Sequence, residues 1–312
     1  MSGGQAPGRR AHPLLGVLLI AGATLAFAAM DNSIRLLGRR LPVILIFWGR
    51  YAFQAVVMGA WLAWRHGRAG FASGSPRFQG LRGLLLTATS ALSFYGLQHL
   101  PAPEFTAVSM LAPLLVTAGA AAWLGEPVGP AQRALVAVGF LGALLVVRPG
   151  SGLFGLPALF PAAFALVFAA FQLLTRRLAG QERPASTHFF TGATGTLLLT
   201  PFLLGADGVV DAISAAPAWA LGLALLLGLL GTGGHLLLIL AFGVAPAATL
   251  MPFSYLQIGF ATLIGAAMFG RWPDGWSLAG MAVVAASGAA TAWLNARGRV
   301  ASPASPRPRR AG

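Results

Sequence analysis

Long apolar runs with almost no charge recur along this chain, and they constrain its fold more than any other feature. A helix that crosses a membrane needs about 20 mostly apolar residues. Only 9% of the 312 residues are charged, against about 25% in a soluble domain, which excludes an ordinary water-soluble enzyme. The sequence therefore predicts an all-α polytopic membrane protein with ten transmembrane helices, at about 14–36, 42–64, 82–99, 104–124, 133–148, 156–175, 186–204, 218–241, 246–269 and 275–295.

Prolines mark the expected helix starts. Pro42, Pro103, Pro184, Pro246 and Pro273 lie at or near the beginnings of predicted spans, where the missing N–H of proline has no helical partner to lose. Several connections between spans are only a few residues long, which makes successive helices antiparallel neighbours.

The basic residues indicate the orientation of the chain in the membrane. All 21 are arginines, and with 7 acidic residues they give a net charge of +14. This charge would suggest a nucleic-acid partner in a soluble protein, but here most arginines lie between apolar runs, where they set topology. With the N-terminus in the cytoplasm, fifteen arginines, Arg82 among them, fall in inner segments and five in outer ones, with Arg50 inside the second span. Both termini are predicted to be cytoplasmic.

An internal duplication divides the chain. Residues 101–126 can be laid over 246–271 with a shift of 145, which matches Ser109 with Ser254 and Gly125 with Gly270. Each copy then holds five spans, and because five is odd the copies cross the membrane in opposite senses, an architecture typical of secondary transporters. The predicted divisions are a cytoplasmic segment 1–13, two repeats at 14–150 and 151–296, and a disordered basic tail 297–312.

Several short motifs carry a resemblance to a known family. The motifs are Phe-Trp-Gly-Arg-Tyr at 47–51, Leu-Ala-Pro-Leu at 111–114, Leu-Gly-Glu at 124–126, Gly-Phe-Leu-Gly at 139–142, Val-Arg-Pro-Gly at 147–150, Ala-Pro-Ala at 245–247 and Pro-Phe-Ser-Tyr at 252–255. With these motifs the chain resembles the drug/metabolite transporter superfamily, in particular its ten-helix proteins with two EamA-type repeats. The second copy departs from the first at Arg271, which replaces Glu126, and at Ile258, which replaces Pro113.

Two ionisable residues inside the spans are the first candidates for function, because such groups are rare in a membrane and usually face a cavity or a partner. Arg50 lies about 12 Å into the second span at 1.5 Å per residue, and Asp31 lies at a similar depth in the first. A pair between them would be either a gate that opens during transport or a static link between helices. Arg50 could also meet a carboxylate of the substrate, and Arg35 competes for Asp31 on the same helix face.

Other polar residues within the spans complete the predicted site. His235 follows a glycine-rich stretch and could relay a proton, or simply hydrogen-bond a backbone carbonyl. The uncharged candidates for substrate binding are Ser254, Tyr255 and Gln257 in the ninth span, Tyr95 in the third and Gln172 in the sixth.

The predicted function is a secondary transporter that moves a small zwitterionic or carboxylated metabolite across a bacterial-type inner membrane, with export favoured. Uptake of a larger metabolite such as S-adenosylmethionine or riboflavin is the alternative implied by the family, and an intramembrane lipid-processing enzyme is the alternative from another class. The chain has no cysteine and no lysine, which excludes thiolate metal sites and a phosphate-binding loop with its lysine. We expect no cofactor, no metal and no nucleic acid, a monomer or homodimer, and coupling to protons or solute exchange.

Overall fold

A computed structural model gives the fold of residues 12–99, 102–148, 156–270 and 272–300. Within these ranges the chain is helical and contains no β-strand. The elements are α1 (Pro13–Leu37), α2 (Val43–His66), η1 (Gly67–Phe71), α3 (Pro76–His99), α4 (Ala102–Ser109), α5 (Ala112–Leu124), α6 (Pro130–Val147), η3 (Leu156–Ala158), α7 (Leu159–Leu178), α8 (Pro184–Leu204), α9 (Val209–Ser214), α10 (Ala218–Val244), α11 (Ala247–Ser254), α12 (Leu256–Phe269) and α13 (Gly275–Val300).

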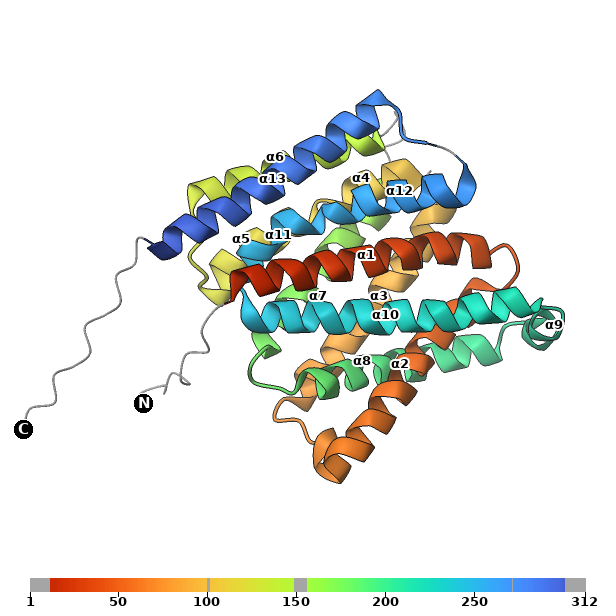
Figure 1. Cartoon of the computed structure of the whole chain (residues 1–312). Helices are drawn as coiled ribbons and strands as arrows, with labels where there is room; N and C mark the ends of the chain where they lie inside the picture. The colour runs from red at the N-terminus through yellow and green to blue at the C-terminus, as the bar shows by residue number, and fades with distance from the viewer. Residues whose placement is uncertain (1–11, 100–101, 149–155, 271, 301–312) are drawn as a thin grey trace, which may run out of the picture.

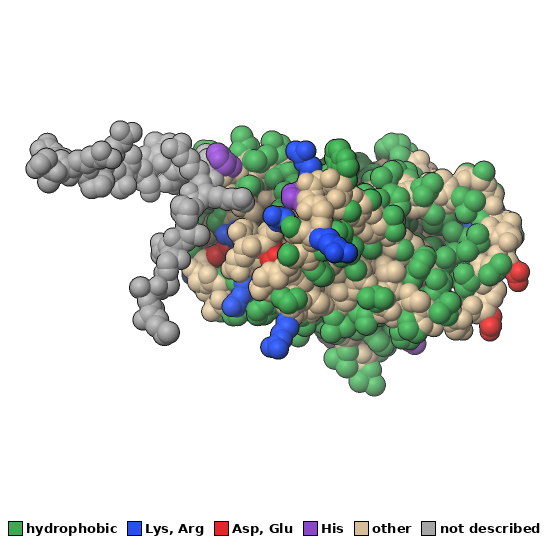
Figure 2. All heavy atoms as spheres, turned by 90° about the horizontal axis from the view of Figure 1, so that it is seen from below, with side chains coloured by type: hydrophobic (Ala, Val, Ile, Leu, Met, Phe, Trp, Pro, Cys, Tyr) green, Lys and Arg blue, Asp and Glu red, His purple; other side chains and the backbone are tan. Residues whose placement is uncertain are grey.

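The predicted apolar runs coincide with these helices, and the protein is a polytopic membrane protein. Six stretches of the described chain are long and apolar enough to cross a membrane: 13–37, 43–71, 130–147, 156–178, 218–244 and 247–269. Much of the surface is apolar too, with many exposed leucine, phenylalanine and tryptophan side chains. Figure 2 shows one such face, largely covered by hydrophobic side chains.

Two of the runs are each broken into a pair of short helices. The first break separates α4 from α5 and the second separates α11 from α12, and the residues that flank them, Ser109 and Ser254, are 145 positions apart. Pro113 has no N–H to continue the helix at the first break. Both broken helices end in the same way, because Gly125 and Gly270 adopt left-handed backbone conformations at their C-caps, which glycine allows without strain.

The helices associate in pairs that repeat with the same shift. α1 packs along α10, as α7 packs along α3. α2 packs on α8, and α6 packs on α13, so that each of these helices meets its own counterpart. Figure 1 shows the α6–α13 pair along one side of the molecule and the α2–α8 pair along the opposite side. Glycines allow the close approach: an added Cβ at Gly192 would lie 2.7 Å from the Ala55 nitrogen, and one at Gly280 would lie 2.6 Å from the Gly142 carbonyl oxygen.

Two boundaries differ from the predicted ones. α3 begins at Pro76, not near residue 82, so Arg82 lies inside a helix and is fully buried rather than in an inner loop. The proline-led start of this helix had been assigned to the preceding connection. α13 continues to Val300, past the predicted start of the tail at 297. The rest of the tail and residues 1–11 lie outside the described residues.

Candidate functional site

Arg50 is the centre of a buried polar cluster. It lies on α2 with only 5% of its surface exposed. Its Nη2 donates a hydrogen bond to Ser90 Oγ on α3 (3.2 Å), and its Nη1 lies 3.5 Å from His235 Nε2 on α10. The guanidinium also lies over the Tyr51 ring, 4.4 Å from its centroid. α10 can come this close because position 231 is glycine, where an added Cβ would lie 3.1 Å from the Arg50 side chain.

A second histidine extends the cluster toward α8. His188 is fully buried, and its Nδ1 lies 3.1 Å from Gln54 Nε2. The other ring nitrogen lies 2.9 Å from the carbonyl oxygen of Thr232 on α10. The rings of His188 and His235 are 6.3 Å apart between centroids. The two histidines therefore link α2, α8 and α10 through buried polar contacts.

Arg82 on α3 is the second buried arginine. Its Nε donates to Thr175 Oγ1 on α7 (2.7 Å), and its Nη1 donates to the Thr187 carbonyl (3.3 Å) and to Thr191 Oγ1 on α8. The guanidinium lies 4.5 Å from the centroid of the Phe171 ring. We call Arg50, Arg82, His188 and His235 the basic cluster.

The basic cluster has no acidic partner among the residues that the structure describes. The two ion pairs found there are Arg148–Asp274 and Arg176–Glu126, both at the ends of helices. Buried charges are normally paired or hydrogen-bonded at all their donors. Instead, several buried polar atoms have no hydrogen-bond partner: Arg50 Nε, Arg82 Nη2, His235 Nδ1, Thr232 Oγ1, Gln54 Oε1 and Gln79 Oε1. The cluster is therefore suited to an anionic or strongly polar ligand.

The predicted pair between Asp31 and Arg50 is not formed. Asp31 accepts a hydrogen bond from Gln257 Nε2 on α12 at 2.9 Å. The residue that faces Arg50 from α1 is Met30, whose Sδ lies 4.0 Å from Nη1. Successive residues on a helix point about 100° apart, so Met30 and Asp31 cannot face the same neighbour. Asp31 and Arg50 lie at a similar depth along their helices, but this depth did not predict which side of α1 Asp31 faces.

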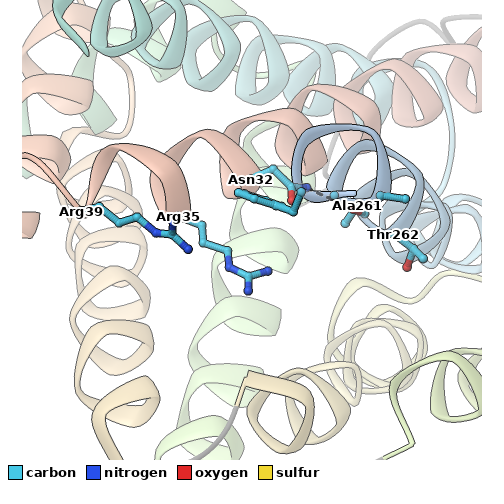
Figure 3. A pocket seen from close by; sticks show the side chains of 8 residues that line it. Asn32, Arg35, Arg39, Ala261 and Thr262 are labelled. Atoms are coloured by element: carbon cyan, nitrogen blue, oxygen red, sulfur yellow. Dashed lines mark hydrogen bonds between the residues drawn. The ribbon is translucent and has the colours of Figure 1, made fainter. Parts of the chain in front are cut away.

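A pocket lies beside Asp31, between α1 and α12. Its volume is about 420 Å³, and we call it the Arg35 pocket. Figure 3 shows Arg35 and Arg39 extending from one side of α1, with Asn32 bonded to the Ala261 carbonyl on α12. The pocket is lined by Asn32, Arg35, Arg39, Ala261, Thr262, Gly265, Ala266 and Phe269. Its charged side chains are positive.

At the opposite end of the bundle, four helix ends are joined through one ion pair. Glu126, just after α5, accepts from Arg176 Nε on α7 at 2.6 Å. Its other oxygen accepts from the backbone N–H of Ala248 in the first turn of α11 (3.3 Å), and Arg176 also donates to the Phe242 carbonyl near the end of α10. Both side chains are mostly buried, with Arg176 25% exposed and Glu126 9% exposed. We call this arrangement the Glu126 junction.

Three pairs of helices also pack differently from their equivalents under the 145-residue shift. α11 packs against α5 and α6, and α7 packs against α10. The equivalent pairs under the 145-residue shift are α4 with α12, α4 with α13, and α3 with α1, and within the described ranges these pairs have minor contacts at most. These three pairs of helices are therefore in closer contact in one arrangement than in its equivalent.

The remaining predicted residues lie in different surroundings. Tyr255 is fully buried at the break between α11 and α12, and its hydroxyl donates to the Met110 carbonyl at the other break (3.3 Å). Ser254 is the half-buried residue before it. Gln172 is buried on α7 beside Phe171, whose ring meets both Arg82 and His235. Tyr95 is 54% exposed on α3, away from Arg50.

Comparison with known proteins indicates a family for the first half of the chain. Residues 14–148 match the EamA-like transporter family. A riboflavin transporter of Rhizobium johnstonii is 35% identical over 189 residues, a match that spans 61% of either chain. A riboflavin transporter of Vibrio cholerae is 28% identical over 92% of this chain and 96% of the relative.

A solved structure agrees with the fold. One crystal structure superposes with a TM-score of 0.75 at 23% sequence identity, over 92% of this chain and 99% of the other. At that identity the likeness concerns the fold. The family and the names of the relatives indicate a transporter and not an enzyme.

Proposed function

We propose that the chain is a secondary transporter that works by alternating access between two inverted repeats, 14–150 and 151–296, each with five membrane spans. The observation that carries this proposal is the hydrogen bond from Tyr255 to the Met110 carbonyl. These two residues are 145 positions apart, so they occupy the same place in the two repeats. Equivalent residues can touch only near the axis that relates their repeats. For inverted repeats that axis lies in the membrane plane, where transporters of this type bind substrate between broken helices.

The orientation follows from the arginine distribution. With both termini in the cytoplasm, the Glu126 junction faces the cytoplasm and the Arg35 pocket faces outward. Exposed arginines such as Arg65, Arg68, Arg77 and Arg177 then lie at the cytoplasmic helix ends, as the positive-inside rule expects. The structure would correspond to a state closed to the cytoplasm. We propose that this membrane is a bacterial inner membrane, which the bacterial origin of the relatives supports.

Arg50 is the proposed centre of substrate binding. It is buried in the middle part of the bundle, contacts Ser90 and His235 through its guanidinium, and has one N–H without a hydrogen-bond partner. Ser254, Tyr255, Gln172, Gln257 and Tyr95 remain proposed contributors; Tyr255 and Gln257 are already engaged with Met110 and Asp31. Asp31 and His235 are proposed for gating or coupling, because each adjoins a place where the helices would part.

Two substrate classes have support. Arg50 has no acidic partner among the described residues, which favours a solute with a carboxylate, including a zwitterion. The presence of an arginine inside a membrane span predicts the same class of solute. The riboflavin transporters among the relatives favour riboflavin uptake instead. Export of the first class and uptake of the second are the two directions to test, with S-adenosylmethionine as a further candidate for uptake. A proton or an exchanged solute would supply the coupling.

Counterflow in proteoliposomes tests the proposal. Vesicles are loaded with one unlabelled compound, an amino acid, riboflavin or S-adenosylmethionine, and the same compound is added outside as a tracer. Transient accumulation of the tracer with one class supports a carrier and identifies the class. Protein of verified fold that accumulates no compound of the set contradicts the proposed substrates, and steady equilibration of tracer without overshoot contradicts a carrier.

A further inference from the structure

Arg82 is a charged residue where the fold does not require one. The 145-residue shift places α3 on α10, and both helices end at equivalent residues, His99 and Val244. The counterpart of Arg82 is then Leu227, which is buried in the apolar core at 1% exposure. A leucine therefore satisfies the packing at this position in the second half. Burying a charged arginine at the equivalent position is energetically costly, and such residues within a membrane usually serve a function.

The surroundings of the Arg82 guanidinium are neutral and incomplete. Its neighbours are two threonine hydroxyls, one backbone carbonyl and the Phe171 ring, and no carboxylate lies within ion-pair distance in the part of the chain that is described. Nη2 has no hydrogen-bond partner although the side chain is fully buried. An arginine has five N–H donors in a fixed fork that matches a carboxylate or a phosphate. One edge of this fork therefore remains free.

A groove lies close to Arg82 at the proposed cytoplasmic surface. It has a volume of about 290 Å³ and runs between the α7–α8 connection and the end of α10. Thr175 and Thr187 line the groove and also accept hydrogen bonds from Arg82. These two threonines thus lie between the guanidinium and the groove.

We propose that Arg82, with Thr175, Thr187 and Thr191, forms a second anion-binding position in the cytoplasmic half of the molecule, separate from Arg50. Its ligand is the carboxylate or phosphate group of the transported solute. This rests on the proposed transport function and narrows the substrate class to anions and zwitterions. Arg50 would hold the anionic group in the state closed to the cytoplasm, and Arg82 would hold it once the cytoplasmic end opens.

Binding to the purified full-length chain in detergent tests this position without requiring transport. Affinities are measured at fixed ionic strength for two matched pairs, riboflavin 5′-phosphate against riboflavin and benzoate against benzamide. In the unmodified chain we expect tighter binding of the anion in at least one pair. Arg82→Gln should weaken the binding of that anion about tenfold or more, the size expected from losing a charge-assisted hydrogen bond, and leave its neutral partner unchanged.

Three further variants keep the test decisive. Arg177→Gln is the matched control, because Arg177 is an exposed arginine near the same end of α7 that lies over Phe78 and Trp123; it should bind like the unmodified chain. Thr175→Val removes only the hydroxyl that accepts from Arg82 Nε, and a severalfold loss of anion affinity in this folded variant supports the site even if Arg82→Gln does not fold. Arg82→Lys should restore part of the affinity.

The inference is overturned by an unmodified chain with no preference for anions in either pair. It is equally overturned if Arg82→Gln keeps the same preference for the anion as the Arg177→Gln control. If Arg82→Gln does not fold, the same outcome in Thr175→Val overturns the inference. Failure of the transport proposal is distinguishable, because it would appear as absent counterflow with the anion preference and its dependence on Arg82 intact.

Discussion

The two ends of this molecule are built from equivalent helices but differ in how tightly those helices meet. At one end, Glu126 and Arg176 join the ends of α5, α7, α10 and α11. At the other, α4 and α12, and also α1 and α3, make minor contacts at most within the described ranges, and the Arg35 pocket lies between α1 and α12, which pack closely. The same sequence pattern, repeated after 145 residues, therefore adopts two different contact patterns. In a fold with repeats this is what one state of a two-state carrier requires.

Charge placement makes the difference between the ends specific. The residue of α1 that corresponds to Arg176 under the 145-residue shift is Asp31, which has the opposite sign. Among the described residues, Asp31 accepts a hydrogen bond from Gln257. The residue that corresponds to Glu126 is Arg271, which lies outside the described residues.

The largest expected effect comes from the residue between the two ends. Arg50→Ala should reduce transport about a hundredfold or more, because it removes a charged group that would hold the substrate by several hydrogen bonds. The protein should remain folded, and its two ends should keep their different accessibilities. Counterflow and the elution profile of the purified protein measure both. Normal transport by Arg50→Ala would show that the site is elsewhere, and loss of folding would favour a structural role for Arg50.

The second prediction breaks the closed end. Glu126→Gln removes the ion pair with Arg176 and weakens the bond to the first turn of α11. For a mostly buried pair we expect about 1–2 kcal/mol, which is about fivefold to thirtyfold in the ratio of the two states. A single cysteine at position 248 should therefore react about tenfold faster from the cytoplasmic side. An unchanged reaction rate would mean that the junction does not hold this end closed.

The third prediction changes the centre without changing charge. Gly231→Ala places a methyl group 3.1 Å from the Arg50 side chain, which should force Arg50 off its preferred rotamer. The substrate KM should rise about threefold to tenfold, from a strain of about 0.5–1.5 kcal/mol. Gly233→Ala is the control, because its added methyl group meets no atom within 4 Å. Equal KM values for the two variants would mean that Arg50 does not contribute to substrate binding.

The smallest effect is expected at the other ion pair. Arg148 and Asp274 are 2.7 Å apart with half of each side chain exposed, and exposed pairs contribute little. Asp274→Asn should change transport less than twofold. The backbone N–H of Ser277 and the nearby Arg148 hold the pKa of Asp274 below its ordinary value. Its small contribution to stability is therefore present at neutral pH and is lost only as the pH falls through that lowered pKa, which thermal unfolding at several pH values can follow. A large loss of transport in Asp274→Asn would mean that this exposed ion pair, and not the Glu126 junction alone, controls transport.

The sequence predicted the helices better than it predicted the neighbours of their polar side chains. Apolar runs and prolines placed most helices within a few residues, and the repeat matched Gly125 with Gly270, which end equivalent helices. The breaks after Ser109 and Ser254 were not predicted. Arg82 was missed because six residues of α3 before it, from Pro76 on, were assigned to a loop. His188 was missed because it lies only four residues into a helix, where a polar residue is ordinary.

The contacts of Asp31 show the physical limit of such prediction. Depth along a helix follows from residue counting, but the direction of a side chain around the helix depends on which neighbour packs on each face. Hydrophobic periodicity usually supplies that direction. In a membrane the outer face of a helix is apolar as well, so the periodicity is weak, and Met30 rather than Asp31 meets Arg50.

Cysteine accessibility tests the central claim most directly, because the chain has no native cysteine. One variant carries a cysteine at Thr262, in the Arg35 pocket, and another at Ala248, which is 1% exposed at the Glu126 junction. With a membrane-impermeant thiol reagent, the account predicts rapid labelling at 262 from outside and slow labelling at 248 from inside, with both rates shifting in opposite directions in Glu126→Gln. Rates that do not move, or that move together, would contradict alternating access between these two ends.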